Sequence, residues 1–266
     1  MPEVIPGAGA PVVVTRPLAQ AIVLQQKILA RGRRAVVFPL LEILPLADNA
    51  ALDAALARLE RFALVAFVSP NAIDACFARR ADWPAVVPLA VMGEGSRQAL
   101  AAHGVTDATH RIHCPRDPDR TDSQTLLAVL DPADLAGRDV LILRGETGRE
   151  LLGDSLRAAG ACVTQVAAYR RMAPVPDAAG KALLVRLLTE GSEWIITSSE
   201  ALQVLIDMVR ALPEKTGITV ARLQQQKLIV PHVRIAETAH SLGFYNVLRT
   251  ASGDERILAA LQFRHE

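Results

Sequence analysis

The chain has 266 residues, of which 51% are hydrophobic and 21% are charged, and its formal net charge is +1. This apolar fraction is well above that of a disordered chain, so the composition predicts a packed globular protein. The length suits one large or two small domains. The near-neutral charge argues against a general nucleic-acid binder, because such a protein needs an excess of lysine and arginine to offset phosphates, although a local basic patch stays compatible with it.

No apolar stretch is long enough to cross a membrane, since a spanning helix needs about 18 uninterrupted apolar residues. The longest candidate, Trp83 to Gly93, contains Pro84 and Pro88. The first residues, Met1-Pro2-Glu3, lack the basic region and apolar run of a signal peptide. The three cysteines lie far apart and predict no disulfide framework. We therefore expect a cytoplasmic protein without a membrane partner.

The chain contains an internal repeat. Val12–Arg16 predicts a short strand, followed by a helical pattern that ends at a glycine and by a second strand at Ala35–Phe38. Asp139–Arg144 begins the same order again, with a helix that ends at a glycine and a strand at Ala161–Val163. The same supersecondary unit therefore opens both halves of the chain.

The segments that follow these units repeat as well. Leu64–Ala72 and Glu193–Ala201 each predict an apolar strand that ends in a serine and opens a helix. Leu89–Gly93 and Leu228–His232 also lead from a strand into a helix, which stops at a glycine in both halves. Because the strands are apolar throughout and alternate with amphipathic helices, we predict an α/β fold with doubly wound parallel sheets.

Candidate hinges occur at equivalent places in the two halves, at Glu42–Leu46 and Arg170–Asp177, and both contain proline. Proline removes a backbone donor and biases the preceding residue away from helix, so both segments are predicted to be linkers. A further loop is predicted at residues 115–119, before a helix through Leu126, Leu127 and Leu130.

Cofactor patterns are weak. Gly93-Glu94-Gly95 lacks the third glycine of a dinucleotide-binding loop, because the required position holds Gln98. His110, His113 and Cys114 lie close together without a second pair of ligands, so we interpret them as solvated loop residues rather than metal ligands. We expect neither a cofactor nor a metal.

Catalytic patterns are equally sparse. No Walker A sequence and no nucleophile elbow occur. Glu146 and Glu150 have the i, i+4 spacing of one helix face and are expected to face solvent.

Polar residues follow the predicted strands at the start of the next helix. In a parallel sheet such loops gather at the carboxyl ends of the strands, where ligands bind. Free N–H groups and hydroxyls at helix N-termini suit carboxylates or phosphates, and nearby arginines add positive charge. For each residue alone, a helix cap without a ligand stays an open alternative. The residues are Thr15, Arg16, Ser69, Asn71, Gly93, Arg144, Ser198, Ser199 and His232.

Tyr169 is one of only two tyrosines in the chain. It is predicted to end the strand Val163–Ala168, immediately before Arg170 and Arg171. A phenol in that place can donate a proton to a ligand. An amphipathic residue that merely closes a strand is the alternative.

In their order along the chain, these segments resemble the uroporphyrinogen-III synthase family. Each motif is short, but the ordered set is specific and runs along nearly the whole chain. The segments are Val14–Pro17, Pro39–Ile43, Phe67–Ala72, Val91–Gly93, Leu143–Gly145, Val166–Arg171 and Thr197–Glu200.

The resemblance implies two flavodoxin-like α/β domains, related by the internal duplication and joined by a two-stranded linker. Residues 1–42 and 174–266 would form one discontinuous domain, and residues 43–173 would form the other. The active-site cleft is expected between them.

The resemblance also implies a reaction. The enzyme closes hydroxymethylbilane, a linear tetrapyrrole, to uroporphyrinogen III with inversion of the terminal pyrrole ring and loss of water, without a cofactor. Tyr169 matches the family's candidate for the general acid. A monomer is expected, with a small polycarboxylate as its substrate. The positions expected to contact that substrate are Thr15, Arg16, Ser69, Asn71, Ala72, Gly93, Arg144, Gly145, Ser198, Ser199 and His232.

Two other classes of protein are compatible with parts of the pattern. A non-enzymatic two-domain binding protein for a small polyanionic ligand would share the hinges and the anion-suited loops. The presence of Tyr169 and the lack of a signal-peptide pattern count against it. A sugar- or nucleotide-dependent transferase would need a glycine-rich phosphate loop that the sequence lacks.

Overall fold

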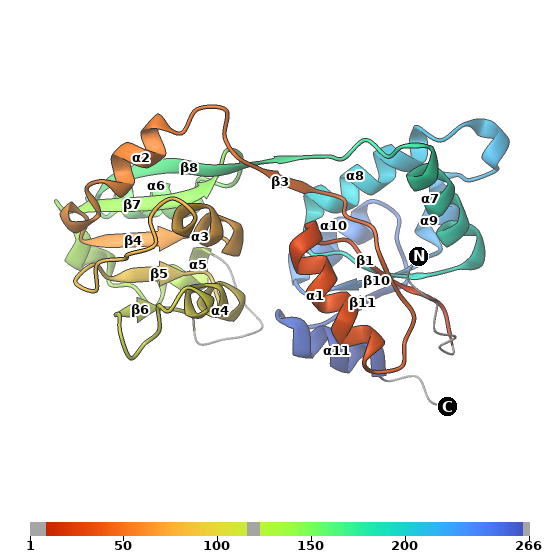
Figure 1. The fold of residues 1–266 in the computed structure, drawn as a ribbon, viewed down its shortest axis with the longest axis horizontal. Coiled ribbons are helices and arrows are strands. Elements are labelled where there is room, and N and C mark those ends of the chain that lie inside the picture. The colour runs from red at the N-terminus through yellow and green to blue at the C-terminus, as the bar shows by residue number, and fades with distance from the viewer. Residues whose placement is uncertain (1–8, 116–122, 263–266) are drawn as a thin grey trace. The chain divides into compact units, whose positions relative to one another are not determined.

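The computed structural model describes residues 9–115 and 123–262 (Figure 1). Most of the loop predicted at residues 115–119 and the amino-terminal Met1-Pro2-Glu3 lie outside this part. The contacts divide the chain into two units. Unit 1 contains the residues up to Glu42 and those from Met172 onward, and unit 2 contains Ile43–Arg171.

Unit 1 is built on a five-stranded sheet with the order β11-β10-β9-β1-β2, in which every pair is parallel. In this order the first strand lies between the second and the third, as in flavodoxin-type sheets. The strands are β1 (Val12–Val14), β2 (Ala35–Val37), β9 (Glu193–Ile195), β10 (Lys227–Val230) and β11 (Val247–Arg249). The helices are α1 (Leu18–Leu29), α7 (Ala178–Glu190), α8 (Ser199–Arg210), α9 (Val220–Gln224), α10 (Val233–Ser241) and α11 (Asp254–Gln262), with a 3₁₀ turn at Glu214–Thr216.

Unit 2 is built on a six-stranded sheet with the order β3-β8-β7-β4-β5-β6, in which the pairs from β8 to β6 are parallel. The strands are β3 (Glu42–Leu44), β4 (Leu64–Phe67), β5 (Leu89–Val91), β6 (Ile112–His113), β7 (Asp139–Gly145) and β8 (Cys162–Met172). The helices are α2 (Ala50–Leu56), α3 (Pro70–Phe77), α4 (Glu94–Ala102), α5 (Ser123–Leu127) and α6 (Leu151–Ala158), with 3₁₀ turns at Leu59–Arg61 and Pro132–Leu135.

The two halves of the internal repeat exchange strands. Unit 1 joins β1 and β2 of the first half to β9, β10 and β11 of the second, and the halves meet where Val12 pairs with Glu193. Unit 2 joins β7 and β8 of the second half to β4, β5 and β6 of the first, and the halves meet where Leu64 pairs with Val140. The hydrogen-bonded neighbours β3 and β8 carry the chain between the units. The predicted α/β fold with two doubly wound sheets is confirmed.

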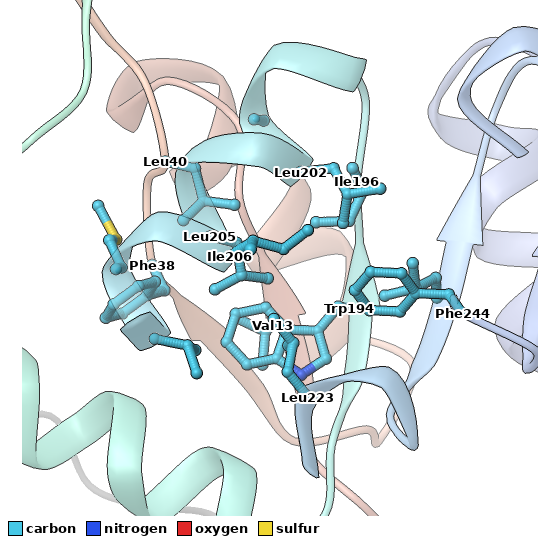
Figure 2. Packing of buried hydrophobic residues seen from close by; sticks show 14 of the residues in the cluster. Val13, Phe38, Leu40, Trp194, Ile196, Leu202, Leu205, Ile206, Leu223 and Phe244 are labelled. Atoms are coloured by element: carbon cyan, nitrogen blue, oxygen red, sulfur yellow. The ribbon is translucent and has the colours of Figure 1, made fainter. Parts of the chain in front are cut away.

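The central strands of unit 1 are buried on both faces. Along β1, Val13 belongs to the core beneath α7 and α8, whereas Val12 and Val14 belong to the core beneath α1 and α11. Trp194 of β9 fills the first core, and the ring of Phe38 meets it edge-on (Figure 2). Two-sided burial explains why these strands show no polar alternation in the sequence.

Unit 2 repeats this arrangement around β4. Val65 and Phe67 point into one core, and Leu64 and Ala66 point into the other. Among the described residues, no helix is long and apolar enough to cross a membrane.

Two strands are longer than predicted. β8 continues past Ala168 to Met172, so Tyr169 lies inside the strand and the prediction that it ends the strand is wrong. β7 continues to Gly145, which pairs with Tyr169 after a register irregularity. The two extensions depend on each other, because each strand supplies hydrogen-bond partners for the other.

Two helices also differ from the prediction. Glu146 and Glu150 do not share a helix, because α6 begins only at Leu151. Gly148 has a φ of +156°, which no helical residue adopts, so a helix cannot pass through this segment. The helix expected to reach Leu130 ends at Leu127.

Candidate functional site

Tyr169 is buried in unit 2, and its hydroxyl lies 3.1 Å from the Oγ of Ser69. Its ring lies against Gly145, where an added Cβ would stand 3.0 Å from the ring Cζ. Its carbonyl oxygen accepts a 2.8 Å bond from the N–H of Glu146. The structure thus brings Ser69, Gly145 and Tyr169 together, all of which are site residues predicted from the sequence.

Ser69 has a second role as the N-cap of α3. Its Oγ accepts a 3.2 Å hydrogen bond from the N–H of Ala72, and Pro70 occupies the first helical position, where no N–H is needed. Asn71 lies in the same first turn and is half-buried. One hydroxyl therefore connects the start of α3 to the phenol of Tyr169.

Arg144 is buried near the end of β7 and forms a closed ring with two other side chains. Its Nη1 donates to a carboxylate oxygen of Glu150 and, at 2.6 Å, to the Oε1 of Gln165. The Nε2 of Gln165 donates at 2.7 Å to the other oxygen of Glu150. The bonds from Arg144 and Gln165 hold the pKa of the Glu150 carboxyl below its usual value. The positive charge of Arg144 is therefore offset inside unit 2.

Gly93 is the N-cap of α4 and offers only its backbone, because it has no side chain that could cap the helix.

Within the described residues, His, Cys, Asp and Glu form no group of three or more that could hold a metal ion. His113 lies in β6 and is half-buried, so the interpretation as a solvated loop residue is wrong for His113. Burial, with the charge of Arg111, lowers the pKa of His113, and burial also raises the pKa of the Cys114 thiol.

In unit 1, Thr15 and Arg16 follow β1 but do not cap α1, whose N-cap is Pro17. The buried hydroxyl of Thr15 donates to the carbonyl oxygen of Ile195 at 2.6 Å, which joins the ends of β1 and β9. The guanidinium of Arg16 lies 2.6 Å from a carboxylate oxygen of Asp254. Thr15 therefore has a structural bond, and Arg16 is paired with an acid.

Asp254 also accepts a 2.7 Å bond from Lys27, so it serves two cations. Burial alone would raise the pKa of the Asp254 carboxyl, but the bonds from Lys27 and Arg16 outweigh burial and lower it. The sequence pattern does not indicate this partner, because Asp254 lies near the end of the chain and Arg16 near its start.

Ser198 and Ser199 have different roles at the start of α8. The Oγ of Ser198 accepts a 3.0 Å bond from the N–H of Ala201 and caps the helix. The Oγ of Ser199 lies 2.9 Å from the Oγ1 of Thr238, which itself donates to the carbonyl oxygen of Arg234. Ser199 therefore links α8 to α10.

His232 is the N-cap of α10 and is only 8% exposed. Its Nδ1 accepts a 3.1 Å bond from the N–H of Arg234, so the neutral ring carries its hydrogen on Nε2. Among the described residues, Nε2 is buried and finds no hydrogen-bond partner. A buried donor without a partner at a helix N-terminus suits an acidic group supplied by a ligand.

These features define an α/β protein of the doubly wound class, with polar groups collected at the carboxyl ends of its strands. A family model described as Uroporphyrinogen-III synthase HemD matches residues 22–252. The chain belongs to the uroporphyrinogen-III synthase family.

Relatives and solved structures agree with this assignment. The chain is 31% identical to the uroporphyrinogen-III synthases of Salmonella typhimurium and Escherichia coli, over 94% of this chain and 99% of each relative. Its fold is similar to that of a uroporphyrinogen-III synthetase from Helicobacter pylori, with a TM-score of 0.59, 14% identity, and coverage of 96% of this chain and 100% of the other. A mutant uroporphyrinogen III synthase from Thermus thermophilus gives a TM-score of 0.57 at 14% identity, covering 96% and 98% of the two chains.

Proposed function

We propose that the chain catalyses the closure of hydroxymethylbilane to uroporphyrinogen III in tetrapyrrole and heme biosynthesis. The reaction inverts the terminal pyrrole ring and releases water, which makes the enzyme a lyase. Family membership supports this reaction, and the names of the two full-length relatives agree with it. The carrying observation in the structure is the Tyr169 hydroxyl, buried beside the Oγ of Ser69 at the end of β4.

The chemistry needs one proton at the leaving group. The bond between the hydroxymethyl carbon and its oxygen breaks, and the Tyr169 hydroxyl gives its proton to that oxygen, which departs as water. The electron-deficient carbon is then attacked by a substituted carbon of the terminal pyrrole, and a spiro intermediate leads to ring inversion. The completed ring releases a proton, which restores the phenol. The protein contributes mainly by holding the flexible chain in the conformation that closes with inversion.

The acetate and propionate groups of the substrate need hydrogen-bond donors. We assign this role first to the backbone N–H groups at the starts of α3, α4, α8 and α10, and to the Nε2–H of His232. Arg16 and Arg144 stay predicted contacts, but their charges are offset by Asp254 and Glu150. The other proposed contacts are Thr15, Ser69, Asn71, Ala72, Gly93, Gly145, Ser198 and Ser199. A monomeric state and a cytoplasmic location belong to the same proposal.

The test supplies enzymatically generated hydroxymethylbilane and separates the isomers of the cyclised, oxidised product. Uncatalysed closure gives isomer I, so accumulation of isomer III above a control without protein supports the proposal. If only isomer I forms, at the rate of that control, the enzymatic function is wrong. A binding protein for a polyanionic ligand would then be the remaining interpretation.

A further inference from the structure

The loop between β7 and α6 is held by polar contacts at its far end and in its middle. At its far end, Glu150 is fixed through both carboxylate oxygens, one to Arg144 and one to Gln165. Arg144 also donates to Gln165, so each of the three side chains bonds to the other two. In its middle, the loop is tied to β8, because Arg171 donates to the carbonyl oxygen of Thr147 at 3.0 Å.

Glycines make room for these contacts. At Gly148 an added Cβ would lie 2.8 Å from the Nη2 of Arg144, so the loop passes directly against the guanidinium. At Gly153, inside α6, an added Cβ would lie 2.4 Å from the Nε2 of Gln165. Glycine inside a helix is destabilising relative to alanine, and here it leaves space for the amide of Gln165. The close approach of both groups therefore depends on the absence of side chains at these two positions.

The near end of the same loop contacts Tyr169. Gly145 lies under the phenol ring, and the N–H of Glu146 donates to the Tyr169 carbonyl oxygen. In the sheet β7 lies between β8 and β4, so the ring must cross β7 at Gly145 to reach Ser69. A small shift of this end of the loop moves the surface on which the ring rests.

We propose that Glu150 and Gln165 are positioning residues for Tyr169. Through Arg144 they fix the loop from Gly145 to Glu150, and the loop sets the phenol against Ser69. Neither residue contacts the reacting atoms in this proposal. The inference rests on the proposed function, because it assigns Tyr169 the role of general acid.

The test exchanges the carboxylate and the amide. In Glu150→Gln an amide replaces the carboxylate, so two amides face each other and Arg144 loses its charged acceptor. In Gln165→Glu two carboxylates face each other, and neither can donate a hydrogen bond when ionised. Each single variant therefore loses part of the ring of hydrogen bonds. In the double variant an amide again faces a carboxylate, and Arg144 again has two oxygen acceptors. We expect each single variant to lower kcat for isomer III about tenfold with little change in KM, since a small misplacement suffices. The double variant should restore most of the rate.

Three controls separate positioning from a general loss of structure. Asp154→Asn removes an exposed acid that pairs with Arg157 on the same helix, and it should leave kcat unchanged. In a Tyr169→Phe background, Gln165→Glu should lower kcat no further, because the residue it positions is gone. Hydrogen exchange of the Glu146 amide should be faster in both single variants and slow again in the double variant.

The outcomes distinguish this inference from the proposed function. Wild-type protein that makes no isomer III contradicts the proposed function. In that case the hydrogen exchange of the Glu146 amide still tests whether Glu150 and Gln165 fix the loop. Single variants with wild-type kcat, or losses that add up in the double variant, contradict the positioning role. If Gln165→Glu lowers kcat by the same factor in the Tyr169→Phe background as in the wild type, the positioning role is contradicted as well, since the effect would then not depend on the Tyr169 hydroxyl.

Discussion

The hydroxyl of Tyr169 lies 3.1 Å from the Oγ of Ser69, although 100 positions separate the two residues along the chain. The contact crosses β7, which lies between β8 and β4 in the sheet. Gly145 of β7 leaves room for the ring, because a Cβ at this position would lie only 3.0 Å from the Cζ of Tyr169. The phenol is therefore held at both its face and its tip, which is the kind of fixed geometry that proton donation needs.

Removing the phenolic hydroxyl should impair turnover while the protein stays folded. Tyr169→Phe keeps the ring on Gly145 but has no proton to give, so we expect a fall in turnover on the order of 10²-fold. The measurement is the initial rate of isomer III formation. Tyr245→Phe is the matched control, because that residue is 87% exposed whereas Tyr169 is 4% exposed. Near-wild-type turnover of folded Tyr169→Phe would remove the assignment.

Ser69→Ala should cost more stability than Ser198→Ala. Both serines cap a helix through the N–H three residues ahead, so each loss costs about 1 kcal/mol from the cap alone. Ser69→Ala also leaves the buried Tyr169 hydroxyl without its partner, which adds about 1 kcal/mol or more. Chemical denaturation of both variants measures the difference, and Ser69→Ala in a Tyr169→Phe background should lose only the cap contribution. Equal losses in the two single variants would contradict this account of the contact.

His232→Ser should weaken substrate binding more than it slows the reaction. Serine still caps α10 by accepting the N–H of Arg234, but it lacks the buried Nε2–H. We expect KM to rise about tenfold with kcat near the wild-type value, because a ground-state hydrogen bond to a carboxylate is lost. Steady-state kinetics check this split. An unchanged KM would show that Nε2 makes no contact with the substrate.

Glu193 should make the stability of unit 1 sensitive to acid. It lies 2.9 Å from both Arg33 and Lys227, at the starts of the strands. Burial would raise the pKa of its carboxyl, but the bonds from Lys227 and Arg33 outweigh burial and lower it. A lowered pKa means that Glu193 stabilises the fold above its ordinary pKa, and this contribution is lost as the pH falls through the folded value.

Glu193→Gln tests this linkage. At neutral pH it should lower the unfolding free energy by about 2–3 kcal/mol, since Arg33 and Lys227 lose a carboxylate but still reach the surface in part. The difference from wild type should shrink as the pH falls, as followed by urea denaturation at several pH values. Asp207→Asn, which breaks an exposed pair with Arg210, should show no such trend. A difference that stays constant with pH would contradict the linkage.

The fold can be predicted well from the sequence, because the strands and the helix ends are marked by local residue patterns. Buried strands such as Leu64–Phe67 are apolar at every position, and Gly104 and Gly243 stand just after α4 and α10 with φ near +80°. Ser69, Ser198 and His232 are found from the sequence for the same reason, because a cap acts on residues only two or three positions ahead.

The hydrogen-bond and ion-pair partners of the site residues are distant in sequence, so local patterns do not predict them. Nothing near Arg144 distinguishes Gln165 from any other polar residue on a strand, and nothing near Arg16 indicates Asp254. The sequence also does not indicate where β8 ends, because the length of this strand depends on pairing with β7 rather than on its own composition. Gly148 and Gly153 do give a signal for the contacts of Arg144 and Gln165. A glycine within or just before a helix indicates that a neighbouring group comes too close for a side chain.

The exchange of strands between the two halves sets the order in which the protein can fold during synthesis. Among the described strands, β1 and β2 are synthesised before those of unit 2, whereas β9, β10 and β11 of the same sheet are synthesised after them. Unit 2 is continuous from Ile43 to Arg171 and can fold while the rest is still being made. β1 can pair with β2 at once, but its other edge pairs with β9 and stays open until that strand is made. A product truncated before β9 would therefore expose an unpaired edge of the apolar β1, and such an edge promotes aggregation.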